Sequence, residues 1–358
     1  MLKIILKKLP KSEVEIEGEL EADAFEAYFS KALKKIGENV EMPGFRKGKV
    51  PENVLLSKIP EAQILGEMAE MALGEHYPKI LEENKLDAIS RPEISITKLV
   101  RTNPLGFKIK TAVMPEIELP DYKKIAKKII SEITEEEKKF DVTEKELEDA
   151  IMDIRKSRAP KKHIKDLPAE TEADLEKNKD IEIKDEDLPP FDNAFVQALG
   201  PFKGIEDFKA KLKENIKLEK ENQLKEKTRL KIIEKIIDDL KVELPEILID
   251  VELNKILYRM ESDITQMGLK FEDYLKHLNK TIEDLKKEFR TDAEKKSKLS
   301  LVLNKIAEIE KLTADKDQVE KEVEAIMEHY KDADKKRTKI HAENVLTNEK
   351  VFQFLENQ

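Results

Sequence analysis

The chain has 358 residues, which is enough for two or three domains and a sizeable hydrophobic core. Charged residues make up 40% and hydrophobic residues 39%, a balance that predicts long solvated helices and an elongated body. The net charge of −10 argues against general nucleic-acid binding, and the absence of cysteine excludes a disulfide framework and a thiolate metal site.

The charge is distributed unevenly along the chain. Residues 1–110 hold 18 basic and 18 acidic side chains, so the whole net negative charge belongs to the remainder. An anion-binding role is therefore expected only in the N-terminal part. No apolar run is long enough for a membrane span, and residues 1–17 lack the apolar core of a signal peptide. We expect a cytoplasmic protein without a membrane partner.

The first part of the chain predicts a small α+β domain over residues 1–112. Four stretches alternate apolar with polar side chains, as strands with one buried face do. These stretches are residues 2–6, 14–20, 94–99 and 107–109. Residues 9–12 supply turn chemistry between the first two strands, so these form a hairpin.

Helices are expected between the two strand pairs. Asp23 and Glu26 have capping-box spacing, and the apolar period that follows predicts one helix up to Val40. Pro51 and Pro60 each suit the first position of a further helix, where a missing N–H costs little.

The stretch Pro43–Pro51 places an aromatic side chain and three cations among turn residues. Gly44 and Gly48 allow backbone turns with positive φ, which predicts a short loop between helices. An aromatic beside clustered cations suits docking onto an anionic partner; the alternative is an ordinary basic loop with Phe45 folded inward. The candidate docking residues are Gly44, Phe45, Arg46, Lys47, Gly48, Lys49 and Pro51.

Residues 113–189 are expected to form an extended linker. Thr143 and Glu146 make a second capping box, which opens a helix that ends at Pro160. Residues 161–187 are highly charged with few apolar anchors, so they predict a solvated connector.

Residues 190–358 predict a large, wholly helical domain. The apolar stripe of its first long helix fades across residues 217–229, as in a helix that projects into solvent. Pro245 begins the next helix and Gly268 ends it, while Asp315 resembles an N-cap with Gln318 as its reciprocal partner. The tail from Val345 is apolar enough to be docked.

Catalytic, metal and cofactor chemistry is not indicated. The five histidines show no metal-ligand spacing. The segment Gly44–Lys49 is close to a phosphate-binding loop, but it has three intervening residues where that motif has four. Val50 also stands where a Ser or Thr is needed to bind magnesium. We therefore predict a protein that is not an enzyme and needs no cofactor.

The loop sequence makes the interpretation specific. Gly-Phe-Arg-Lys-Gly-Lys-Val-Pro over Gly44–Pro51 resembles the signature Gly-Phe-Arg-x-Gly-x-x-Pro of trigger factor, the bacterial ribosome-associated chaperone. The order of elements after the loop, and the helical region from residue 188, resemble the N-terminal and C-terminal domains of that family. The resemblance covers most of the chain.

The resemblance implies a docking role for the loop. Phe45, Arg46 and Lys47 would contact a ribosomal protein of the large subunit and nearby rRNA, beside the exit of the nascent chain. The physical chemistry agrees, because an Arg can bind a carboxylate or phosphate in bidentate fashion and an aromatic adds an apolar anchor. The family also implies an ATP-independent chaperone that holds nascent or unfolded polypeptides, and a homodimer away from the ribosome.

One departure from the family is large. Members typically carry a prolyl-isomerase domain of FKBP type between the linker and the helical domain. Here only about 30 residues separate Pro160 from Pro189, which is too few for such a domain. We therefore expect a short form without isomerase activity.

The client-binding surface should lie on the helical domain, where methionines and aliphatic side chains can adapt to many partners. The candidates are Tyr258, Met260, Met267, Leu301, Val302 and Leu303. For any one of them, the alternative is ordinary packing in the helical core. Three alternatives remain for the chain: a helical ribosome-associated scaffold without client binding, a folding factor with weak isomerase activity, and an extracytoplasmic chaperone.

Overall fold

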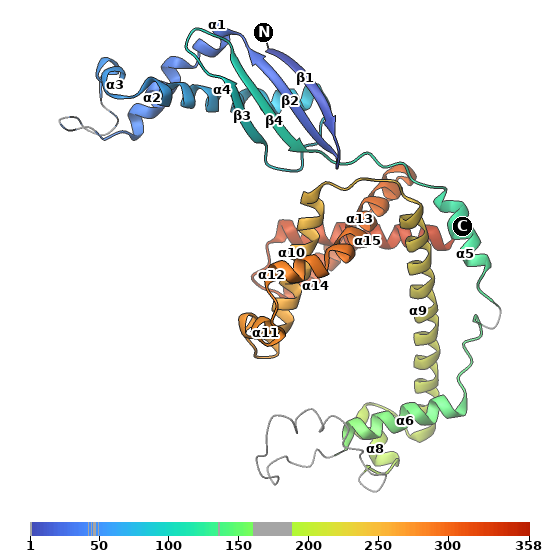
Figure 1. The fold of residues 1–358 in the computed structure, drawn as a ribbon. Helices are drawn as coiled ribbons and strands as arrows, with labels where there is room; N and C mark the ends of the chain where they lie inside the picture. Colours follow the sequence, from blue (N-terminus) through green and yellow to red (C-terminus); the bar gives the residue numbers. More distant parts are fainter. Residues whose placement is uncertain are drawn as a thin grey trace. The chain divides into compact units, whose positions relative to one another are not determined.

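The computed structural model describes residues 2–358 except 42, 44, 46, 47, 49, 135, 136 and 160–187. It confirms the predicted α+β class, with a small N-terminal sheet and a large helical C-terminal region (Figure 1). Backbone contacts group the chain into two compact units, residues 1–120 with 236–351 and residues 121–235 with 352–358. The units interleave along the chain, whereas the sequence suggested three consecutive domains; that division stays a prediction.

The N-terminal sheet is antiparallel and has the strand order β1-β2-β4-β3. Its strands are β1 (Leu2–Leu9), β2 (Glu13–Leu20), β3 (Glu93–Lys98) and β4 (Leu105–Ala112). All four were predicted, because one face of the sheet is apolar and the period-2 pattern is therefore clear. The other face carries ion pairs across neighbouring strands, such as Lys7 and Lys108 with Glu17 and Lys110 with Glu13.

Helices cover the apolar face of the sheet. They are α1 (Ala22–Glu26), α2 (Phe29–Asn39), α3 (Glu52–Lys58) and α4 (Glu61–Glu83). Side chains of β2, β4, α1, α2 and α4 form one hydrophobic core. At its centre Gly18 faces Phe107, and a Cβ on Gly18 would lie 2.5 Å from the Phe107 ring. The glycine is therefore needed for the ring to lie across the strand.

The predicted capping box at Asp23 and Glu26 is wrong. The structure breaks the expected single helix into α1 and α2, with Glu21 at the N-cap of α1 and no side-chain cap bond. The break lies beside Tyr28, which is buried and donates a hydrogen bond of 2.9 Å to Glu75 of α4. Burial and this bond raise the pKa of Tyr28 to about 12. Packing against α4 thus outweighs the local helical pattern.

The second unit contains α5 (Tyr122–Ser131), α6 (Glu144–Arg158), α8 (Asn193–Leu199) and most of α9 (Ile205–Asp239). Four aromatic rings, those of Phe191, Phe195, Phe202 and Phe208, pack edge to face or tilted where α6, α8 and the start of α9 meet. Beyond this cluster α9 is mostly exposed through its middle. The exposure agrees with the fading apolar stripe, although Lys220, Lys227 and Arg229 of this stretch form ion pairs with glutamates of neighbouring segments.

The capping box at α6 is confirmed. Thr143 accepts a hydrogen bond from the Glu146 backbone N–H, and Glu146 accepts one from the Thr143 backbone N–H. Lys220 of α9 lies 2.7 Å from the Glu146 carboxylate. This ammonium group and the Thr143 donors lower the pKa of Glu146 to about 2, so the charge persists at neutral pH.

Five further helices and most of a sixth belong to the first unit, counted over the described residues. They are α10 (Glu246–Gln266), α11 (Phe271–Leu278), α12 (Ile282–Glu288), α13 (Arg290–Glu310), α14 (Lys316–His329) and α15 (Lys335–Glu356). Helices α10 and α13 pack along each other, with Leu253 and Ala293 buried between them. The expected stop after α10 is confirmed, since Gly268 has a φ of +81°. Asp315 is confirmed as the N-cap of α14, because it accepts hydrogen bonds from two backbone N–H groups, but the predicted capping box with the Gln318 side chain is not formed.

The apolar tail is docked, as predicted. Residues 352–358 belong to the second unit, and Leu355 is 1% exposed. Arg229 of α9 donates to both carboxylate oxygens of Glu356, at 2.6 and 3.1 Å, and its guanidinium lies 5.1 Å from the centre of the Phe352 ring. The end of α15 is thereby fixed to α9. Across the part of the chain that the structure describes, no helix could cross a membrane.

Candidate functional site

The predicted docking loop joins α2 to α3. The two helices approach closely at Gly37, where a Cβ would lie 2.8 Å from the Leu55 side chain. Leu55 is buried in the N-terminal core, and Val50 packs partly against that core. Pro51 takes the N-cap position of α3, one residue earlier than predicted. The ends of the loop are therefore attached to a packed scaffold.

Phe45 is 41% exposed at the tip of this loop. The exposure excludes the alternative in which the ring is folded into the core. Gly48 has a φ of +74°, a backbone conformation that favours glycine, as the sequence indicated. Gly44, Arg46, Lys47 and Lys49 lie outside the described residues.

A second apolar side chain of this region was not singled out by sequence. Leu56 lies on α3 and is 47% exposed, although its neighbour Leu55 is buried. Because Leu55 and Leu56 are adjacent and identical, the sequence does not indicate which of the two side chains faces the core. Only the direction of α3 against α2 decides it, so sequence alone offered no signal.

An open groove of about 700 Å³ lies among α10, α11 and α13. Its apolar lining is formed by Ile256, Met260, Ile264, Met267, Tyr274, Phe289, Leu299 and Leu303. Charged side chains of both signs surround it, namely Glu252, Lys255, Arg259, Asp263 and Lys296. Such a surface offers adaptable apolar contact without selecting one sign of charge.

The structure separates the six predicted client-binding residues into three groups. Met260 and Met267 line the groove, and Met267 is 78% exposed. Tyr258 is 75% exposed but is not among the groove residues, and Leu301 lines a different hollow. Val302 is buried at 0% exposure, so we correct its assignment from client surface to helical core, whereas Leu303 contributes to the apolar lining of the groove although it is only 3% exposed.

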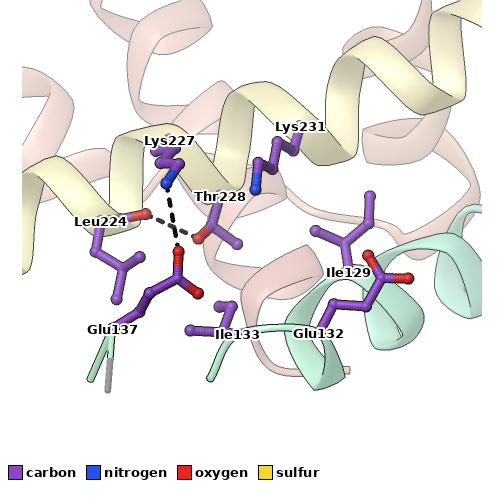
Figure 2. Close-up of a pocket in the computed structure, with 8 residues that line it drawn as sticks. All are labelled: Ile129, Glu132, Ile133, Glu137, Leu224, Lys227, Thr228 and Lys231. Atoms are coloured by element: carbon purple, nitrogen blue, oxygen red, sulfur yellow. Dashed lines mark hydrogen bonds and ion pairs between the residues drawn. The ribbon is translucent and has the colours of Figure 1, made fainter. Parts of the chain in front are cut away.

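The second unit has a narrow hollow of about 30 Å³ between the end of α5 and α9 (Figure 2). Lys227 and Glu137 form an ion pair of 3.3 Å across it, and Thr228 donates to the Leu224 carbonyl. A hydrogen bond from Thr134 and the Lys227 ammonium lower the pKa of Glu137. The space fits about one water molecule, so it joins two segments and is no ligand site. Within the described ranges, no three His, Asp or Glu side chains converge as metal ligands.

Comparison with known proteins assigns the family. Residues 2–154 match the family model of the bacterial trigger factor protein, and residues 204–357 match the model of its C-terminus. A trigger factor of Carboxydothermus hydrogenoformans is 28% identical, over 96% of this chain and 95% of that protein. A trigger factor of Natranaerobius thermophilus is 25% identical, over 92% of this chain and 87% of that protein.

The fold agrees with a solved structure. The structure described as "Promiscuous Substrate Recognition in Folding and Assembly Activities of the Trigger Factor Chaperone" superposes with a TM-score of 0.56. It covers 99% of both chains at 18% identity, so it bears on the fold alone. Because the two family models together match most of its length, the chain belongs to the trigger factor family of ribosome-associated chaperones.

Proposed function

We propose that the chain docks through the Pro43–Pro51 loop beside the exit tunnel of the large ribosomal subunit and holds emerging polypeptides without ATP. The exposed Phe45 on its packed scaffold is the observation that carries this proposal. Arg46 and Lys47 follow it directly in sequence and supply the charge for a ribosomal protein and rRNA phosphates. Binding should weaken as salt rises, because these contacts are exposed and screened.

The proposed client surface is the groove among α10, α11 and α13, with Tyr258 and Leu301 kept as outlying candidates. Its openness to solvent suits segments that are still unfolded. A cytoplasmic location and a homodimer away from the ribosome follow from the family resemblance, and both stay predictions. An aggregation assay distinguishes this function from that of a scaffold without client binding. A client-holding chaperone suppresses the aggregation of an unfolded test protein, whereas a scaffold does not.

Replacing Met260, Met267 and Tyr274 together by serine should weaken the suppression of aggregation at least about a hundredfold in chaperone concentration, since each apolar contact contributes about 1–2 kcal/mol. The measurement is light scattering of a chemically unfolded protein diluted into buffer. A matched control changes Ile309, Ile340 and Val345 to serine, three exposed side chains that do not line the groove. Equal loss in both variants would contradict the groove as the client site.

We also propose that this chain lacks prolyl-isomerase activity. Residues 159–192 separate α6 from α8, fewer than the roughly 100 residues of an ordinary domain. The aromatic rings at this junction pack against one another, with Phe208 buried. Isomerisation of a proline peptide should stay at its uncatalysed time of tens to hundreds of seconds. A rate that rises in proportion to the chaperone concentration would contradict the proposal.

A further inference from the structure

Strand β3 is an uncovered edge of the N-terminal sheet. It is the last strand in the order β1-β2-β4-β3, and only β4 pairs with it among the described residues (Figure 1). All six of its residues are exposed. An edge strand presents backbone N–H and C=O groups that are free to pair with a further strand, and natural proteins usually protect such edges.

The edge also carries an apolar rim on the side of the sheet that faces the core. Ile94 pairs with Ile109 and Ile96 pairs with Phe107 in the register of β3 with β4. The two β4 side chains are fully buried, whereas Ile94 and Ile96 are 46% and 41% exposed. The covering helices therefore shield β4 and leave β3 open. Two apolar side chains two residues apart match the period of an extended strand.

Charge does not restrict what this edge can pair with. β3 carries one acidic residue, Glu93, and one basic residue, Lys98, at its two ends. On β4 next to it, Lys108 and Lys110 are already paired with glutamates of β2. A partner strand of either charge sign is therefore accepted. The opposite edge differs, because β1 carries Lys3 and Lys8 in addition to Lys7, which is paired with glutamates of β2, and lysines along an edge oppose pairing.

We propose that the β3 edge captures an extended segment of an unfolded client by strand addition. The backbone groups of β3 indicate the type of partner. A row of N–H donors and C=O acceptors forms hydrogen bonds with another extended backbone, whatever the sequence of that backbone. An emerging polypeptide offers such a backbone unpaired. A six-residue strand spans about 20 Å, so a short client segment fills it. This site is separate from the helical groove, and the inference rests on the chaperone function of the family.

The test uses the full chain and two ten-residue peptides. In one peptide valine alternates with serine, and in the other every backbone nitrogen of the same sequence is methylated, so that no N–H group remains on either edge. Amide hydrogen exchange of residues 93–98 should slow at least fivefold with the first peptide and stay unchanged with the second. Replacing both Ile94 and Ile96 by lysine should reduce affinity for the first peptide at least fivefold.

Ile5→Lys is the matched control, because Ile5 is 61% exposed on the opposite edge strand. It should leave peptide affinity unchanged. Unaltered exchange of residues 93–98 at saturating peptide would overturn the proposal, even if the protein still suppresses aggregation. If the amide protection of residues 93–98 rises with protein concentration in the absence of peptide, the edge pairs with a second copy of the chain and the proposal is overturned. A protein that protects β3 but fails to suppress aggregation would leave strand capture standing and overturn the wider holding function.

Discussion

Ribosomes should fail to co-sediment with the chain in which Phe45, Arg46 and Lys47 are all replaced by alanine. Phe45 is exposed, so its removal costs the fold little and leaves the packed scaffold of α2, α3 and α4 unchanged. Central aromatic and arginine anchors of an interface each contribute about 2 kcal/mol or more, so three losses together predict a fall in affinity of at least about a hundredfold. This fall in affinity is measured by co-sedimentation of the protein with ribosomes at two salt concentrations.

A control with similar chemistry separates docking from a general loss of charge. Tyr330, Lys335 and Arg337 offer one exposed aromatic and two exposed cations in the helical part. Their replacement by alanine should leave ribosome binding unchanged. The circular dichroism of both variants should match that of the unchanged chain. Normal ribosome binding by the loop variant would show that the docking surface lies elsewhere.

Arg229→Ala should release the end of α15 from α9. The Arg229 and Glu356 side chains are only 17% and 18% exposed, and the pair is bidentate. Removing the arginine leaves Glu356 with Lys225 at 3.7 Å, a more distant cation. Breaking a largely buried pair leaves the Glu356 carboxylate without its main partner. The free energy of local opening of the end of α15 should therefore fall by about 2–3 kcal/mol. Native-state hydrogen exchange of the last turn of α15 measures this change.

Lys255→Ala is the comparison for an exposed pair. Lys255 lies 2.6 Å from Glu252, but its side chain is 66% exposed. Because solvent screens such a pair, its loss should lower the free energy of local opening by less than about 0.5 kcal/mol. Equal effects of the two substitutions would show that burial does not strengthen the Arg229–Glu356 pair.

Features set by near neighbours could be predicted from the sequence. The capping box of Thr143 and Glu146 needs only the spacing of two side chains, and the stop at Gly268 needs only one backbone conformation. The alternation of β2 reports directly that one of its faces is buried. The family signature in the loop likewise lies within eight consecutive residues.

Features set by distant packing could not be predicted. The break between α1 and α2 depends on Tyr28 reaching Glu75, which lies far along the chain. Val302 and Leu303 read as adaptable apolar residues until α13 is placed against its neighbours, which bury both. The exposed rim of β3 was missed for the same reason. Ile94 and Ile96 alternate like core residues, and only the extent of the covering helices shows that they are open.

The return of the last residues to the second unit has a consequence for biosynthesis. Residues 352–358 complete a unit whose other members end at residue 235, and residues up to 351 complete the first unit. Both units thus close long loops, whose ordering is slow and entropically costly. Since a chain leaves the ribosome from its N-terminus, neither unit can finish folding until residues 351–358 have emerged.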